Sequence, residues 1–323
     1  MGGIRRVKIE IETPPVAGDS ALSAKISALV VAPANDRLAA APAVLFCLPG
    51  GGLTKAYFDL DAEGDRSFSF AEHMARRGHI TIALDHPGVG ESSKPEDGFL
   101  LTPRAVAAVD AAVVERCKAM LRDGLAGLPP LANFKSVGVG HSMGGMLTGY
   151  VQAHFAPYDA VAILGSGVHG LVDHLPEPLR PLAGDAELAA RELVPRLKAL
   201  SAAPYRALVR TPLTEAVFFR GEPAGLQAMR RAATPLIVVC GSFSMTPGSW
   251  APEAAQITTP IFLQFGDDDL CPNPHLAPAA YTACPDLTLM VTREMGHCHF
   301  VYPTRGLLFE RFGAWLDGAC LGR

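Results

Sequence analysis

Several features that mark other classes of protein are missing from this sequence. No apolar run approaches the length needed to cross a bilayer, and the first residues, MGGIRRVKIEIE, contain no apolar core of signal-peptide length. No run of basic residues stands out, and the formal net charge is -4, with 28 Lys and Arg against 32 Asp and Glu. We therefore expect a cytoplasmic protein with no membrane span and no nucleic-acid partner.

Paired cysteines and a phosphate-binding loop are also missing. The seven cysteines are scattered, with no C-x-x-C pair. An odd number without a framework of fixed spacings favours reduced thiols over disulfides. A glycine-rich stretch, Pro49 to Gly52, is not followed by Lys-Ser or Lys-Thr at the spacing of a P-loop. These gaps exclude a disulfide scaffold and a P-loop nucleotide site.

What is present is a long chain in which strand and helix patterns alternate. Its 323 residues, 49% hydrophobic and 19% charged, are enough for one large domain with a sizeable insertion. Ile4 to Ile11 and Leu22 to Ala32 are expected to form an N-terminal antiparallel hairpin. After it, buried strands are predicted at Ala43 to Leu48, Ile80 to Leu84, Val137 to Val139, Tyr158 to Leu164, Pro260 to Phe265 and Asp286 to Val291. Helices are predicted between them at Ser67 to Arg77, Pro103 to about Arg122 and Met143 to Phe155, with a last helix from Thr304. This alternation predicts an α/β fold with a mostly parallel sheet of roughly eight strands and helices on both faces. Ligands should bind beyond the carboxyl ends of the strands.

The pattern changes between residues 169 and 257, where prolines recur and the helix-like pieces are short. Asp185 to Val194 and Pro223 to Ala233 are two such pieces. We interpret 169–257 as a helical cap inserted into a core formed by 1–168 and 258–323. Its nine Lys or Arg and eight Asp or Glu nearly balance, so composition indicates no preference for an anionic substrate. Large apolar residues such as Phe218 and Trp250 either line a pocket or pack the cap.

The stretch SVGVGHSMGG, residues 136–145, has the G-x-S-x-G pattern of a nucleophile elbow. A short apolar run leads into a turn with Ser142 at its tip, and a helix-like run follows. Gly140 and Gly144 fit a turn too tight for side chains on either side of the serine. The pattern predicts that the hydroxyl of Ser142 stands above the edge of a sheet.

Three further motifs follow predicted strands: LPGGG at 48–52, DHPGVGES at 85–92, and the late pair GDDDLCP and MGHCH. With GHSMG at 140–144, this order resembles the α/β-hydrolase superfamily, in which a catalytic triad runs Ser, Asp or Glu, His. The resemblance covers nearly the whole chain except the cap. It implies a serine hydrolase that needs no metal or organic cofactor and acts on a small-molecule substrate.

The resemblance assigns roles to single residues. Ser142 would be the nucleophile and His297 the base that takes its proton, with His299 as the competing base or a pocket residue. Asp269 matches the family position of the acid that orients the base, three residues after Gly266 and three before Pro272. Asp267 and Asp268 would shape the turn. The alternatives of a hard-cation site at the three aspartates, or of zinc at His297, Cys298, His299 and Cys271, lack the ligand spacing of a closed site.

The oxyanion hole implied by the resemblance uses the backbone N–H of Met143 and a second N–H from Gly51 or Gly52, between which the sequence does not choose. Pro49 stands where many family members have histidine, but the donor is a backbone group. Pocket candidates are Tyr57, Phe218, Trp250 and His299.

Three functions are compatible with these residues. The first is hydrolysis of a carboxylic ester, thioester or related acyl bond of a hydrophobic small molecule. The second uses the same triad for C–C bond hydrolysis, acyl transfer or lyase chemistry, which the fold alone does not decide. The third is a non-catalytic receptor on the same scaffold, which would have no need of Ser142, Asp269 and His297 together. The oligomeric state, including a homodimer, is left open.

Overall fold

A computed structural model of the chain describes residues 3–13, 23–200, 202–209, 211–271 and 273–320. Leu22, at the start of the second predicted strand, and Pro272, in the motif used to place the acid, lie outside these ranges. Among the described residues, no helix is both long and apolar enough to cross a membrane.

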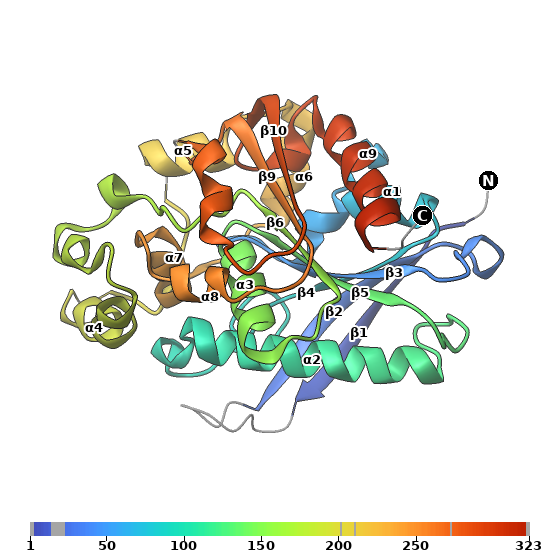
Figure 1. Cartoon of the computed structure of the whole chain (residues 1–323), viewed down its shortest axis with the longest axis horizontal. Helices are drawn as coiled ribbons and strands as arrows, with labels where there is room; N and C mark the ends of the chain where they lie inside the picture. The colour runs from blue at the N-terminus through green and yellow to red at the C-terminus, as the bar shows by residue number, and fades with distance from the viewer. Residues whose placement is uncertain (1–2, 14–22, 201, 210, 272, 321–323) are drawn as a thin grey trace.

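An eight-stranded sheet forms the centre of the molecule (Figure 1). Its spatial order is β1-β2-β4-β3-β5-β6-β9-β10. The strands are β1 (Arg5–Thr13), β2 (Ala24–Ala32), β3 (Ala43–Leu48), β4 (Ile80–Leu84), β5 (Lys135–His141), β6 (Ala160–Leu164), β9 (Ile261–Asp268) and β10 (Leu287–Gly296). β1 and β2 pair antiparallel, β2 runs antiparallel to β4, and all later pairs are parallel. The predicted fold class is confirmed.

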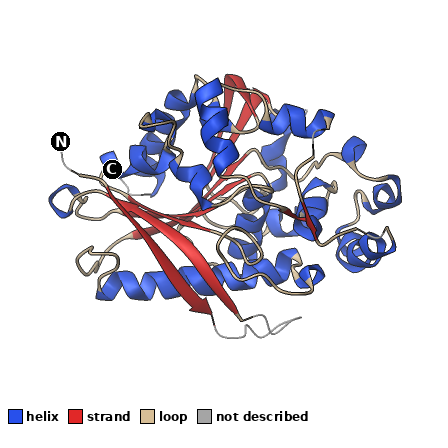
Figure 2. Ribbon diagram, turned by 180° about the vertical axis from the view of Figure 1, so that it is seen from behind, coloured by secondary structure: helices blue, strands red, loops and turns tan. Residues whose placement is uncertain are grey.

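Helices cover both faces of this sheet, as Figure 2 shows from behind. The main ones are α1 (Phe70–Arg76), α2 (Pro103–Asp123), α3 (Met143–Phe155) and α9 (Arg305–Trp315). Alternate residues of β3 enter two different cores: Val44 and Phe46 join the core beneath α2 and α3, whereas Leu45 and Cys47 join the core beneath α1 and α9. Because both faces of each central strand are buried, these strands read as continuous apolar runs in the sequence.

The segment between β6 and β9 holds the remaining helices and a two-stranded sheet. They are α4 (Ala186–Ala199), β7 (Tyr205–Arg206), α5 (Pro212–Phe218), α6 (Pro223–Arg231), β8 (Leu236–Ile237), α7 (Val238–Met245) and α8 (Ala251–Ala255). The helix expected to end at Val194 instead continues through Pro195 to Ala199, after starting from its N-cap Asp185. A proline inside a helix removes one backbone hydrogen bond, and here the helix continues despite that loss.

Two other expected boundaries differ in detail. The helix expected to begin at Ser67 is α1, whose N-cap is Ser69, because the hydroxyl of Ser69 accepts the N–H of Glu72. A short 3₁₀ turn, Arg66–Phe68, occupies the predicted first residues. The last strand extends beyond Val291 to Gly296 with an irregular register after Thr292, which carries the chain to the histidine loop.

Candidate active site

Ser142 lies at the junction of β5 and α3, in the strained backbone conformation of an elbow. Its φ is 54° and its ψ is -123°. The turn is too tight for side chains at its flanks. A Cβ added to Gly140 would lie 2.1 Å from the carbonyl oxygen of Gly144, and one added to Gly144 would lie 2.1 Å from the carbonyl oxygen of Leu48. The two glycines of the motif therefore have a steric reason, and the turn presents Ser142 at the carboxyl edge of the sheet.

His297 follows β10 and is hydrogen-bonded to residues from two other strand ends. Its Nε2 lies 2.8 Å from Oγ of Ser142, and its Nδ1 lies 2.6 Å from Oδ1 of Asp269. With a proton on Nδ1 donated to the carboxylate, Nε2 is the acceptor for the serine hydroxyl. The chain of contacts joins residues that are 155 and 28 positions apart in the sequence. It places the hydroxyl of Ser142 next to the imidazole of His297, and that imidazole next to the carboxylate of Asp269.

The three adjacent aspartates have separate partners. Oδ1 of Asp267 accepts the N–H of Met295, and Asp268 forms an ion pair of 2.6 Å with Arg220. Only Asp269, whose side chain is fully buried, contacts the histidines. Burial opposes ionisation of Asp269, but the neighbouring His297 and His299 outweigh it and hold the pKa of this carboxyl well below its usual range.

His299 is placed behind the base, on the far oxygen of the acid. Its Nε2 lies 2.9 Å from Oδ2 of Asp269, so it donates a second hydrogen bond to the carboxylate. Burial lowers the pKa of His299, although the hydrogen bond to Asp269 opposes that shift. The lowered pKa favours the neutral ring. His299 neither contacts Ser142 nor lies on the wall of the cavity described below. Among the histidines that the structure describes, His297 is hydrogen-bonded to Ser142, whereas His299 is hydrogen-bonded to Asp269.

A third histidine, His141, supports His297 from the strand side. Its Nε2 donates to the carbonyl oxygen of His297 over 2.8 Å, and its ring packs on Tyr57 with centroids 4.7 Å apart. Burial, together with the neighbouring His297 and His299, lowers the pKa of His141 well below its usual range. Sequence reasoning missed this role. The only available signal was that His141 occupies the variable position of the G-x-S-x-G motif.

Two backbone N–H groups lie near the serine. Met143 is the first residue of α3, so its N–H has no carbonyl partner within the helix. Gly51 lines the same cavity as Ser142, and a Cβ added there would lie 3.7 Å from Cβ of Met143. Gly52 is not part of that wall, and its carbonyl accepts the N–H of Thr234. The arrangement favours Gly51 over Gly52 as a donor beside Met143.

The glycine loop that carries Gly51 is held from below by a buried ion pair. Nδ1 of His86 lies 2.7 Å from Oδ2 of Asp110, and Nε2 lies 3.1 Å from the carbonyl oxygen of Pro49. Both neighbours are acceptors, so both ring nitrogens donate and His86 carries a positive charge. Burial lowers the pKa of His86, but Asp110 and the carbonyl oxygen of Pro49 outweigh burial, so the pKa is raised overall. Sequence reasoning missed this pair; its signal was an aspartate on the apolar face of α2.

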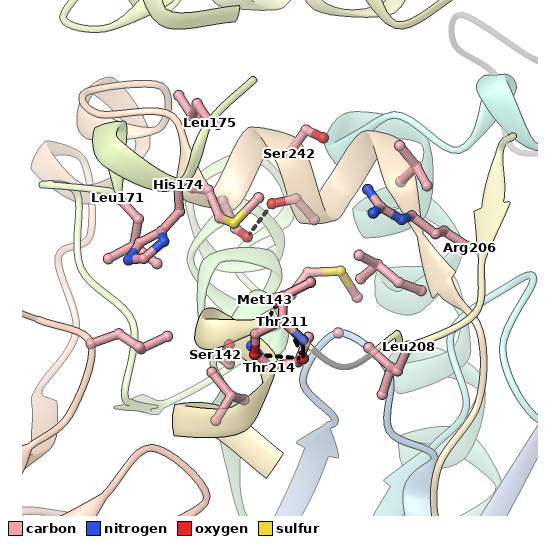
Figure 3. Close-up of a pocket in the computed structure, with 18 of the residues that line it drawn as sticks. Ser142, Met143, Leu171, His174, Leu175, Arg206, Leu208, Thr211, Thr214 and Ser242 are labelled. Atoms are coloured by element: carbon pink, nitrogen blue, oxygen red, sulfur yellow. Dashed lines mark hydrogen bonds between the residues drawn. The ribbon is translucent and has the colours of Figure 1, made fainter. Parts of the chain in front are cut away.

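A cavity of about 960 Å³ opens above the serine (Figure 3). Ser142, Met143 and His297 lie at its base, and most of its wall comes from the 169–257 segment, including Phe218.

Three of the residues expected in the pocket lie elsewhere. Tyr57 is fully buried and stacks on Phe300, and Trp250 is fully buried against Gly149 of α3. His299 lies beneath Asp269, as described above. Large aromatic side chains fill space between elements most effectively, and at Tyr57 and Trp250 that packing outweighs exposure to a cavity.

The aspartate and histidine loops also contain residue types that bind metals. Within the described parts of the chain, no group of three or more His, Cys, Asp or Glu side chains is arranged to hold a metal ion. His297 and His299 instead share the carboxylate of Asp269.

Solved structures with a similar fold were found by comparison. A hypothetical protein from Pseudomonas aeruginosa is 16% identical with a TM-score of 0.63, over 98% of this chain and 94% of that one. A thermophilic esterase from Thermogutta terrifontis with malate bound is 16% identical with a TM-score of 0.61, over 96% and 99%. A thioesterase domain from the curacin biosynthetic pathway is 15% identical with a TM-score of 0.57, over 94% and 98%. At these identities the likeness establishes the fold.

Comparison with sequences gives the family. No match was found among curated protein sequences. A family model described as the alpha/beta hydrolase family matches residues 44–308, which include the elbow, the acid loop and the histidine loop. The chain therefore belongs to the alpha/beta hydrolase family.

Proposed function

We propose that this protein is a serine hydrolase that cleaves a carboxylic ester, thioester or related acyl bond of a small, apolar substrate. One observation carries the proposal: the hydrogen-bonded chain from Ser142 through His297 to Asp269, with contacts of 2.8 Å and 2.6 Å. A serine hydroxyl is a weak nucleophile unless a positioned base accepts its proton, and this geometry provides that base.

The reaction proceeds through an acyl-enzyme. Nε2 of His297 takes the proton of Ser142 while Oγ attacks the carbonyl carbon, and the N–H groups of Met143 and Gly51 stabilise the oxygen that becomes negative. The protonated His297 then donates that proton to the leaving group as its bond to the acyl carbon breaks. Water, deprotonated by His297, attacks the acyl carbon, and the proton returns to Oγ of Ser142 as the acid is released.

Asp269 and His299 support this cycle without taking part in proton transfer. Asp269 keeps the proton of His297 on Nδ1 and stabilises the ring when it becomes positive. His299 donates to the second oxygen of the same carboxylate and so limits its rotation. The acid thus stays ionised and aligned in both half-reactions.

The 169–257 segment acts as the cap of a core formed by 1–168 and 258–323. Leucine, valine, alanine and proline residues, with Met245 and Phe218, make up most of its share of the cavity wall, which suits an apolar substrate better than a sugar or a peptide.

The test is covalent labelling with a fluorophosphonate, followed by the mass of the intact protein. We expect one adduct on the wild type and none on Ser142→Ala. Ser166→Ala is the matched control, because Ser166 lines the same cavity but is hydrogen-bonded to no histidine among the residues that the structure describes. It should label like the wild type. An unlabelled wild type, or labelling that survives in Ser142→Ala, would refute the proposal.

A further inference from the structure

The charges of the 169–257 segment are not distributed evenly around the cavity. The segment holds nearly equal numbers of acidic and basic residues. Among the described residues, however, the cavity wall contains no Asp, Glu or Lys, and its only arginine is Arg206. The remaining basic side chains of that wall are histidines, among them His169 and His174. Arg206 is exposed to solvent and also lines the cavity, so a permanent positive charge stands at the edge of a largely apolar space, where no described residue of the wall carries a negative charge.

The two-stranded sheet of β7 and β8 sets the direction of Arg206. Arg206 lies directly opposite Leu236 in the antiparallel pair, and residues in that relation point to the same face, with Cβ atoms about 5 Å apart. Leu236 packs on the glycine loop, because a Cβ added to Gly51 would lie 2.5 Å from its Cδ1. The side chain of Arg206 therefore shares a face with a residue that touches the proposed oxyanion loop.

The neighbouring residue secures this orientation from the other side. Successive side chains of a strand point to opposite faces, so Tyr205 points away from the cavity. Its hydroxyl donates to the carbonyl oxygen of Pro95 over 3.0 Å, and the ammonium of Lys94 lies 3.9 Å from the centre of its ring. These contacts of Tyr205 fix β7, and Figure 3 shows the side chain of Arg206 directed toward the cavity.

The guanidinium of Arg206 is free to bind a ligand. Within the described ranges, no ion pair or side-chain hydrogen bond engages it. Arg220, in the same segment, is by contrast paired with Asp268 at 2.6 Å. An arginine presents a planar fork of donors that matches the two oxygens of a carboxylate.

We propose that Arg206 forms a specificity subsite that binds a carboxylate on the substrate, separated from the scissile ester by an apolar spacer. This inference rests on the proposed function and narrows it to esters that carry one negative charge, such as half-esters of straight-chain dicarboxylic acids. Leu208 and Leu175 line the same cavity and offer surface to the spacer. Substrates with an amine in place of the carboxylate would meet Arg206 with a like charge and no compensating acid.

Binding to the Ser142→Ala protein tests the subsite without turnover. Monomethyl suberate and dimethyl suberate have the same chain, and only the first carries a charge. We expect the monoanion to bind about tenfold more tightly by calorimetry, the size of one charge-assisted hydrogen bond. Adding Arg206→Met should abolish this ratio, and Arg206→Lys should restore part of it. Arg191→Met is the control, because it removes the same charge from the segment at an exposed arginine that pairs with its neighbour Glu192.

Equal affinity for the two esters, absence of binding by the monoanion, or a ratio unchanged by Arg206→Met would overturn the subsite. These outcomes are distinct from failure of the proposed function, which is read from fluorophosphonate labelling of the wild type. A protein that labels normally but shows no preference retains the function and loses the subsite. A protein that prefers the monoanion but does not label retains the subsite and loses the function.

Discussion

The molecule contains two buried His–Asp pairs with nearly the same geometry and different surroundings. His297 and Asp269 are 2.6 Å apart, and His86 and Asp110 are 2.7 Å apart. The difference lies at the other ring nitrogen. Nε2 of His297 faces the hydroxyl of Ser142, which can donate a proton, whereas Nε2 of His86 faces the carbonyl of Pro49, which can only accept one.

This contrast shows that a carboxylate beside a histidine does not by itself make a base. The pair at His297 leaves Nε2 with a lone pair for the serine proton. The pair at His86 has both nitrogens occupied as donors, so its charge is held in place and fastens the loop that carries Gly51. In the proposed function the first pair cycles a proton, whereas the second pair contacts the backbone of the glycine loop.

The largest expected effect is a loss of activity when the first pair, His297 and Asp269, is changed. Asp269→Asn preserves the shape of the side chain but offers an amide N–H to Nδ1 of His297, which favours the wrong tautomer. We expect kcat for 4-nitrophenyl butyrate to fall about 10⁴-fold with little change in the urea midpoint. A loss of less than about tenfold would contradict the role of Asp269.

The same substitution in the second pair, His86 and Asp110, should lower the free energy of unfolding more than it lowers activity. Asp110→Asn leaves the charged ring of His86 buried without its partner, and breaking one side of a buried ion pair costs about 3–5 kcal/mol. Urea unfolding measures that loss. Because Asp110 is hydrogen-bonded to His86 and not to the Ser142–His297–Asp269 chain, kcat in the folded fraction should fall much less than in Asp269→Asn. An Asp110→Asn protein as stable as the wild type would refute the ion pair.

The smallest expected effect is a pH dependence confined to the second pair. The pKa of His86 is raised in the folded protein above its ordinary value of 6.5, so the ion pair contributes fully below pH 6.5. Its contribution is lost as the pH rises through the folded pKa. The difference in unfolding free energy between the wild type and His86→Gln should therefore be greatest in mild acid and narrow toward alkaline pH. A difference that grows with pH would contradict the charge assigned to His86.

Local patterns predicted much of the fold. The strands β3 and β4 and the helix α3 have the bounds that their apolar runs and flanking glycines predicted. The sequence did not fix a helix boundary where two nearby residues were both able to cap the helix. Ser67 and Ser69 are both able to cap a helix, and in the structure the hydroxyl of Ser69 caps α1 while the hydroxyl of Ser67 accepts a hydrogen bond from Arg305.

In the candidate site, too, local motifs predicted some residues and missed others. Motifs named Ser142, Asp269 and His297, and the structure brings these three side chains into one hydrogen-bonded chain. They gave no role to His141, His86 or Asp110, whose contacts join residues between 24 and 156 positions apart and are not part of the motifs. Tyr57 and Trp250 were expected in the pocket from their chemical type, which is equally that of core residues.

By itself, the sequence determined the order of strands and helices and the chemical groups that follow each strand, because periodicity and turn residues act over short distances. Only the tertiary structure decided which of three adjacent carboxylates meets the histidine and which of two histidines meets the serine. It also separated the charges of the 169–257 segment, whose composition is nearly neutral, so that the described part of the cavity wall includes Arg206 and no acidic side chain. These choices depend on which distant elements pack together, and no local pattern encodes them.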